Sequence, residues 1–114
     1  MARSVVLLVA ALLATLPSVA AALTYPARPI RFLVGYAPGG ASDSIARILG
    51  QKLGEAWGQQ VPVENRPGAS TNIAADVAAR SKPDGHTLFM LSAANAINPT
   101  LYPKLNYDPV RDFA

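Results

Sequence analysis

The stretch IRFLVGYAPGGASDS, residues 30–44, predicts a strand, a sharp turn and the start of a helix. Residues 30–37 are apolar apart from one arginine and one glycine, which indicates a central strand of a parallel sheet with helices on both faces. Pro38 then ends the strand. Because Gly39 and Gly40 have no Cβ, they permit positive φ angles and a close approach of the backbone to a ligand.

The turn at residues 38–40 has two interpretations. The amides in the first turn of a helix lack partners inside it, and in an open α/β sheet this turn lies at the carboxyl end of a strand, where ligands bind. The turn would then be a cradle for a small anion. Alternatively, it is only a tight connection, with Ser42 or Asp43 capping the helix. The spacing does not match the P-loop or the G-x-G-x-x-G nucleotide motif.

Residues 1–22 have the composition of a secretory signal peptide. Arg3 supplies a positive start, an uncharged apolar run follows, and small residues permit cleavage after Ala20 or Ala22. The apolar run is short for a membrane span. We therefore expect a cleaved leader, export to the periplasm and a mature chain of residues 23–114.

Composition narrows the class of partner. The 114 residues carry a formal net charge of +3 and include no cysteine. The basic residues are scattered among the acidic ones, which argues against a nucleic-acid partner. Without cysteine the exported chain cannot form disulfides, so its stability must come from its core. No cluster of histidine or paired carboxylates has the pattern of a metal site, so we expect no metal and no cofactor.

The rest of the chain predicts a β-α-β-α-β pattern. Apolar residues at helical spacing predict a helix at 41–57, and a short β-branched run predicts a strand at 60–65, where Pro62 favours a sheet edge. A second helix is predicted at 69–80 and a buried strand at 87–91. Because such crossovers are right-handed, the three strands should be parallel, with the most apolar one central, in the order 2-1-3.

The first helix has a clear apolar stripe. Gly50 and Gly54 within it indicate either close packing on the sheet or a looser helix, and Gly58 is a natural C-terminal stop. We expect the following stripe to be its buried face: Ile45, Ile48, Leu49, Leu53, Ala56 and Trp57.

The end of the chain is rich in proline dipeptides. Beyond Asn95 we expect a loop, with at most a short helix at 100–104. The parallel order puts three turns at one edge of the sheet: residues 38–40, 65–71 and 92–95.

Three segments together carry a resemblance to a known family. They are YPARPIRFLVGYAPGGASDSIARILGQKL (25–53), VPVENRPGASTNIAADVAARSKPDGHTLFM (61–90) and AINPTLYPKLNYDPVRDF (96–113). The combined turns P-G-G-x-x-D, E-N-R-P-G and P-D-G, followed by N-P-x-L-Y-x-x-L-x-Y-D, resemble the solute-binding proteins of tripartite tricarboxylate transporters, also called Bug or TctC-type periplasmic receptors.

The resemblance implies a two-lobed type II periplasmic binding fold without catalytic activity. Residues 23–114 would be the N-terminal part of the first lobe, with the second lobe absent. The expected ligand is a small carboxylated metabolite, and the expected partners are the membrane subunits of the transporter, with the receptor itself a monomer. An inert truncated product remains an alternative.

By position, the resemblance implies ligand-binding residues on three loops. The family more often has a further glycine where this chain has Ser70 or Thr71. The implied residues are Tyr36, Ala37, Pro38, Gly39, Gly40, Asp43, Ser70, Thr71, Asn72, Ser92, Ala93 and Asn95.

An enzymatic function is the competing hypothesis. A secreted α/β hydrolase-like enzyme would use the same anion cradle. However, Ser42 and Ser44 have no suitable base, and His86, the only histidine, has no evident carboxylate partner and is expected at the opposite end of its strand. We interpret His86 and Trp57 as packing residues, and Asp43 as a helix cap.

Overall fold

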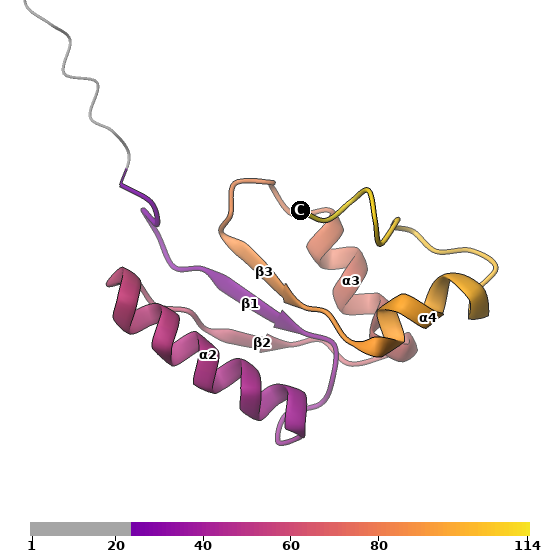
Figure 1. Ribbon diagram of the computed structural model, residues 1–114, viewed down its shortest axis with the longest axis horizontal. Helices are drawn as coiled ribbons and strands as arrows, with labels where there is room; N and C mark the ends of the chain where they lie inside the picture. The colour runs from indigo at the N-terminus through magenta and orange to yellow at the C-terminus, as the bar shows by residue number, and fades with distance from the viewer. Residues whose placement is uncertain (1–23) are drawn as a thin grey trace, which may run out of the picture.

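The computed structural model describes residues 24–114, which form a three-stranded parallel sheet with helices on both faces (Figure 1). The strands are β1 (Arg31–Val34), β2 (Val63–Asn65) and β3 (Thr87–Met90), in the order β2-β1-β3. Both pairings are parallel. The predicted strand order is confirmed. The predicted signal peptide lies outside the described residues.

Four helical segments connect and follow the strands. They are α2 (Ala41–Trp57), the short η1 (Ala69–Thr71), α3 (Asn72–Ala79) and α4 (Ala93–Leu101). Figure 1 shows α2 along one face of the sheet and α3 on the other. The central strand is therefore covered on both sides, which its continuous apolar sequence predicts.

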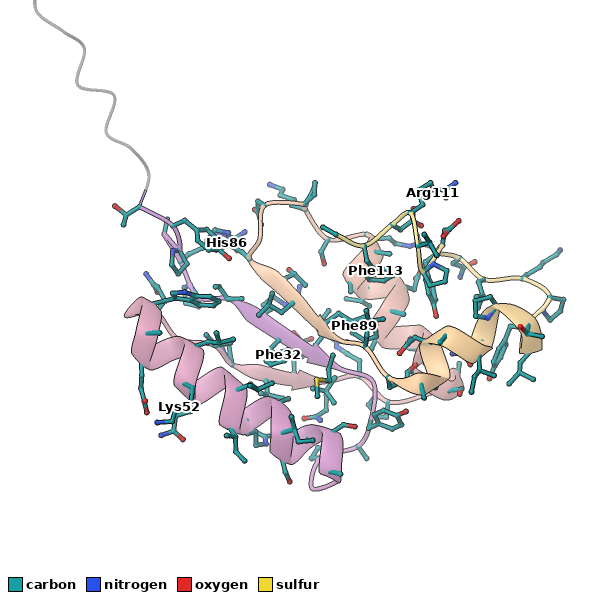
Figure 2. The ribbon with its side chains drawn as sticks, in the orientation of Figure 1. Phe32, Lys52, His86, Phe89, Arg111 and Phe113 are labelled. Atoms are coloured by element: carbon teal, nitrogen blue, oxygen red, sulfur yellow. The ribbon has the colours of Figure 1, made fainter. Side chains whose placement is uncertain are left out.

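The pleat of β1 divides the core into two layers. Phe32 and Val34 point to one face, where they pack with Ala46 of α2. Leu33 points to the other face, and so does its register partner Phe89, whose ring stacks on Phe113 at 5.7 Å between centroids (Figure 2). Both layers form around β1, the strand that carries the first predicted turn.

The face of α2 that packs on the sheet is not the predicted one. The buried residues are Asp43, Ala46 and Gly50, whereas Ile45, Ile48 and Leu49 are 48%, 63% and 44% exposed. The cause is a very close approach of the helix to the chain entering β2. A Cβ on Gly50 would lie 2.9 Å from the carbonyl oxygen of Val61, and one on Gly54 would lie equally close to that of Gln59. Of the two interpretations of these glycines, close packing is therefore correct.

The prediction of an irregular chain beyond Asn95 is wrong for residues 96–101, which continue helix α4, whereas residues 102–114 form no further helix or strand. Helix α4 runs through Pro99, although proline inside a helix removes one hydrogen bond and costs about 3 kcal/mol. The side chain of Asn95 accepts a hydrogen bond from the amide of Ser92 at 3.0 Å and stabilises the first turn. Asn98 forms long-range hydrogen bonds to the segment around Ser70, and these hold the residue before the proline in place.

The amino-terminal ends of β1 and β3 adjoin an aromatic cluster. Tyr25 contacts both Trp57 and His86 edge to face, at 6.2 Å and 5.1 Å between ring centroids, and its hydroxyl donates to the carbonyl of Gly85. His86 is buried in this cluster. Its Nδ1 lies 3.4 Å from Oδ1 of Asp84, so the expectation that it has no carboxylate partner is wrong. Its packing role agrees with the sequence interpretation.

No helix among residues 24–114 is both long and apolar enough to cross a membrane.

Candidate functional site

Three loops meet at the carboxyl ends of the strands. We call them loop 1 (residues 36–43), loop 2 (residues 65–72) and loop 3 (residues 92–95). They follow β1, β2 and β3 respectively, and each leads to the N-terminus of a helix, as Figure 1 shows. Because the three strands are parallel, the three helix N-termini lie together at the carboxyl ends of the strands.

Loop 1 owes its shape to one glycine rather than two. Gly39 has a φ of 90°, in the region that favours glycine, whereas Gly40 has a φ of −83° and is extended. The expectation that both glycines use positive φ is therefore wrong for Gly40. A Cβ at Gly40 would meet only the carbonyl oxygen of Ala37 at 3.9 Å, so the space above this turn is open.

Asp43 connects loop 1, α2 and loop 2. Its Oδ2 accepts hydrogen bonds from the amide of Gly39 and from Nε of Arg47, both at 2.9 Å, and its Oδ1 accepts from Nδ2 of Asn65 at 2.9 Å. Asp43 is only 3% exposed, so these hydrogen bonds are sheltered from water. Arg47 foremost, then Gly39 and Asn65, lower the pKa of Asp43 to about 2. Asp43 lies at the third helical position, but its carboxylate bonds to the amide of Gly39, the residue before the N-cap, and α2 has no side-chain cap hydrogen bond, so the predicted capping role is not observed.

Loops 1 and 3 are joined by hydroxyl groups. The hydroxyl of Tyr36 donates to Oγ of Ser92 at 3.1 Å, and Oγ of Ser92 donates to Oδ1 of Asn95 at 3.0 Å. The Asn95 side chain is buried, and its Nδ2 has no hydrogen-bond partner among the described residues. A buried unpartnered donor costs about 1–3 kcal/mol, which is the kind of exception expected at a functional site.

Loop 2 is strained. Ala69, Ser70 and Thr71 have φ angles of 46°, 53° and 72°, and they directly follow Gly68 at 127°. Left-handed backbone costs about 1–2 kcal/mol for each residue with a Cβ. The predicted helix at 69–80 therefore begins only at Asn72, and its N-cap Thr71 makes no side-chain capping bond.

Two contacts hold this strained turn in place. Thr71 packs closely against Gly35, the residue after β1: a Cβ added to Gly35 would lie 2.6 Å from the Cβ of Thr71. On the other side, Nδ2 of Asn98 donates to the carbonyl of Ser70 and to Oδ1 of Asn72, both at 2.7 Å. Tyr107 donates from its hydroxyl to the same Asn72 oxygen at 2.7 Å.

Sequence reasoning missed Asn98 and Tyr107. Asn98 precedes a proline, and both residues lie in the stretch beyond Asn95 for which the sequence predicts a loop. The available signal was the polar residue at Asn98 one helical turn after Asn95, which puts both on one face of a helix.

The predicted site residues fall into three groups by exposure. The buried side chains of Asp43, Thr71 and Asn95 build the loops from inside, and Asn72 and Ser92 are half-buried. The remaining seven are exposed at the sheet edge: Tyr36, Ala37, Pro38, Gly39, Gly40, Ser70 and Ala93.

The electrostatic potential at the three helix N-termini favours an anion. The first-turn amides of α2, α3 and α4 lack partners within their helices, and their dipoles point positive ends toward the loops. The one carboxylate of loop 1, on Asp43, already has three hydrogen-bond donors. Residues 24–114 contain no cluster of three metal-ligating side chains.

A hollow of about 770 Å³ adjoins loop 3. Ser92 and Asn95 form one wall, but most of its other walls are apolar, including Leu91, Pro99 and Val110. The hollow also contains Asp108, whose pKa is held below its usual range by the backbone amides of Arg111 and Val110, so it is charged at neutral pH. A negative group there opposes a carboxylate, so we centre the anion site on the three loops.

Comparison with known proteins identifies the family. The sequence model of the tripartite tricarboxylate transporter family receptor matches residues 45–114. The chain belongs to this receptor family. Its relatives include a UPF0065 protein from the tcbD–tcbE intergenic region of Pseudomonas sp. strain P51, 43% identical over 89 residues that cover 78% of this chain and 26% of the relative. Protein BugT of Bordetella pertussis is 42% identical over 91 residues, 78% of this chain and 28% of that protein.

Solved receptor structures share the fold. A structure described as a periplasmic transporter superposes with a TM-score of 0.72 at 44% identity, covering 75% of this chain and 29% of the other. MatC of Rhodopseudomonas palustris, solved with bound malate, gives 0.72 at 35% identity over 77% and 30% of the two chains. R. palustris Rpa4515, solved with adipate, gives 0.71 at 34% identity over 75% and 29%. The present chain thus spans under a third of the length of these receptors.

Proposed function

We propose that this chain is part of a periplasmic solute-binding protein that binds a small carboxylated metabolite for a transporter of the tripartite tricarboxylate type. Residues 1–22 would direct its export as a signal peptide and then be cleaved. The mature protein would act as a monomer that delivers its ligand to the membrane subunits. The observation that carries the proposal is the meeting of three helix N-termini at one open sheet edge.

The chemistry of binding follows from this arrangement. A carboxylate at the carboxyl ends of the strands would accept hydrogen bonds from first-turn amides, whereas the hydroxyl hydrogens of Tyr36 and Ser92 are already donated to Ser92 and Asn95. No cationic partner is required, because oriented amides supply the positive potential. Two of the similar receptors were solved with dicarboxylates, malate and adipate, which makes these two compounds the natural first probes.

A second lobe would strengthen binding. A carboxylate at one open edge stays hydrated, so the amide dipoles act through a high dielectric and contribute little beyond what water offers. Closure over the ligand would exclude that water. We therefore expect residues 24–114 to contribute one wall of the complete site.

The alternative of a secreted hydrolase lacks support in the described residues. Ser44 donates its hydroxyl to the carbonyl of Gly40, and His86 lies at the opposite end of the strands, so the two cannot form a nucleophile and base. A binding function requires neither group.

Isothermal titration with malate and with adipate tests the proposal on a receptor in which residues 24–114 are completed by a second lobe, because one open wall alone should bind weakly. Gly40→Val would place a branched side chain in the open space of loop 1, where the carboxylate is expected. We predict at least about a tenfold loss of affinity, equivalent to about 1.4 kcal/mol. Ala56→Val is the control, because it also introduces a valine, at an exposed position at the far end of α2. Equal affinity in Gly40→Val and Ala56→Val would refute the proposed position of the ligand.

A further inference from the structure

Loop 2 adopts a conformation that its own sequence disfavours. Three successive residues with side chains, Ala69, Ser70 and Thr71, are left-handed. Strained backbone of this kind persists only where the surroundings determine it. Loop 2 supplies three of the predicted ligand-binding residues, so whatever holds its shape also determines where those residues point.

Asn98 is the polar side chain best placed to hold the turn. It is fully buried in α4, 28 residues along the chain from Ser70. Its single amide nitrogen donates both of its hydrogens, one to the carbonyl of Ser70 inside the turn and one to Oδ1 of Asn72 at the start of α3. It therefore joins the strained turn to the helix that follows it.

The two atoms of the Asn98 amide have unequal roles. Oδ1 is buried and has no partner among residues 24–114, whereas Nδ2 has two. Both partners are acceptors, so this orientation of the amide is the one the surroundings require. The residue is needed as a double donor, and a side chain of the same size without that nitrogen leaves the Ser70 carbonyl unpaired.

We propose that Asn98 is a positioning residue for ligand binding: it fixes loop 2 in its left-handed conformation and so aligns the first turn of α3 with the anion site. The inference rests on the proposed carboxylate-binding function. It assigns to α4 a role in shaping the site through loop 2, in addition to the one that Ser92 and Asn95 have in loop 3.

The test compares two variants that each remove one donor from the same network. Asn98→Leu removes both hydrogen bonds to loop 2 and α3 while keeping a side chain of similar size. Tyr107→Phe removes only the hydroxyl that donates to Asn72 and leaves the bond to Ser70 intact. Each is measured for thermal stability, for malate and adipate binding, and by NMR for the amide shifts and the HN–Hα coupling of Ser70, which reports its φ.

We expect Asn98→Leu to change the Ser70 coupling. It should also weaken dicarboxylate binding about tenfold, because the misaligned first turn of α3 would lose about one hydrogen bond to the ligand. Tyr107→Phe should leave the Ser70 coupling unchanged. Ala69→Gly, which removes one Cβ from the strained turn, should restore most of the affinity when combined with Asn98→Leu, because glycine adopts positive φ without strain.

Each outcome is decisive. Unchanged Ser70 coupling in a folded Asn98→Leu variant would overturn the inference, and so would a loss of binding that Ala69→Gly does not restore, since the asparagine would then only contribute stability. If the parent protein, completed by a second lobe, binds neither dicarboxylate, the proposed function fails. The Ser70 coupling still decides whether Asn98 holds the turn.

Discussion

Asn65 donates a hydrogen bond from Nδ2 to Oδ1 of Asp43 at 2.9 Å, and this bond joins the end of β2 to the first turn of α2. The same nitrogen donates to the carbonyl of Tyr36 at 3.0 Å. One amide therefore fixes both the start and the end of loop 1. The buried carboxylate of Asp43 therefore anchors loop 1 from the inside.

The first prediction compares two aspartates. Asp43 and Asp76 each pair with an arginine four residues later, but Asp43 is almost fully buried and bonded to two further groups, whereas Asp76 is partly exposed. We expect Asp43→Asn to lower the melting temperature clearly more than Asp76→Asn does, because exposed pairs contribute about 0–1 kcal/mol and the latter variant removes only such a pair. Equal shifts, measured by circular dichroism, would show that Asp43 has no special structural role.

The second prediction concerns acid stability. Arg47, Gly39 and Asn65 hold the pKa of Asp43 at about 2, below its ordinary value of 3.8. A carboxyl whose pKa is lower when folded stabilises the protein fully above its unfolded pKa, and loses that contribution as pH falls through the folded one. The contribution of Asp43 should therefore be constant at neutral pH and disappear between about pH 4 and pH 2.

Other carboxyls also stabilise the fold against acid, so the parent chain alone does not isolate Asp43. The pKa of Glu64, for example, is lowered by hydrogen bonds from Arg31 and Arg66. The quantity to measure is the difference in unfolding free energy between the parent and Asp43→Asn. It should shrink on acidification over that interval, and a difference that stays constant down to pH 2 would contradict the assignment.

Sequence reasoning predicted the sheet because its signals are local. Apolar β1 and the turns that follow each strand fix the β2-β1-β3 order through general rules of handedness. The family and the three loops followed from motifs at those turns. These features need no knowledge of how distant side chains meet.

The errors in loop 2, α4 and α2 arise from contacts between residues far apart in the sequence. The left-handed turn at Ala69 and helix α4 beyond Asn95 depend on bonds between Asn98 and loop 2, which no local pattern contains. In α2 the apolar stripe ordinarily marks the buried face, yet the small residues Ala46 and Gly50 face the sheet because only they fit at this separation.

The third prediction tests that close approach. Gly50→Ala would normally stabilise a helix by about 1 kcal/mol. Here the new Cβ would lie 2.9 Å from the backbone oxygen of Val61, so the helix must move away from β2. We expect a net loss of about 1–3 kcal/mol, the usual cost of overpacking, in urea denaturation. Gly40→Ala serves as the control without a close contact; since alanine is less favourable than glycine at this N-cap, we expect a loss of stability, but one smaller than that of Gly50→Ala.

The last prediction concerns the outward face of α2. Ile45, Ile48 and Leu49 lie at positions i, i+3 and i+4 and therefore adjoin one another on the helix surface. With Ile48 63% exposed, its replacement by lysine removes little buried apolar area. We expect Ile48→Lys to change the unfolding free energy by less than about 0.5 kcal/mol, as surface substitutions do.

Ala46, unlike Ile48, is fully buried, on the opposite side of the same helix. Ala46→Lys would force a charged chain between α2 and β1 and should prevent folding. Ile48→Lys should also reduce the binding of an apolar fluorescent dye, because it interrupts a contiguous apolar patch. If Ile48 were the core residue that the helical periodicity predicts, its replacement by a charge would instead cost at least about 3 kcal/mol, so denaturation of this single variant distinguishes the two faces of α2.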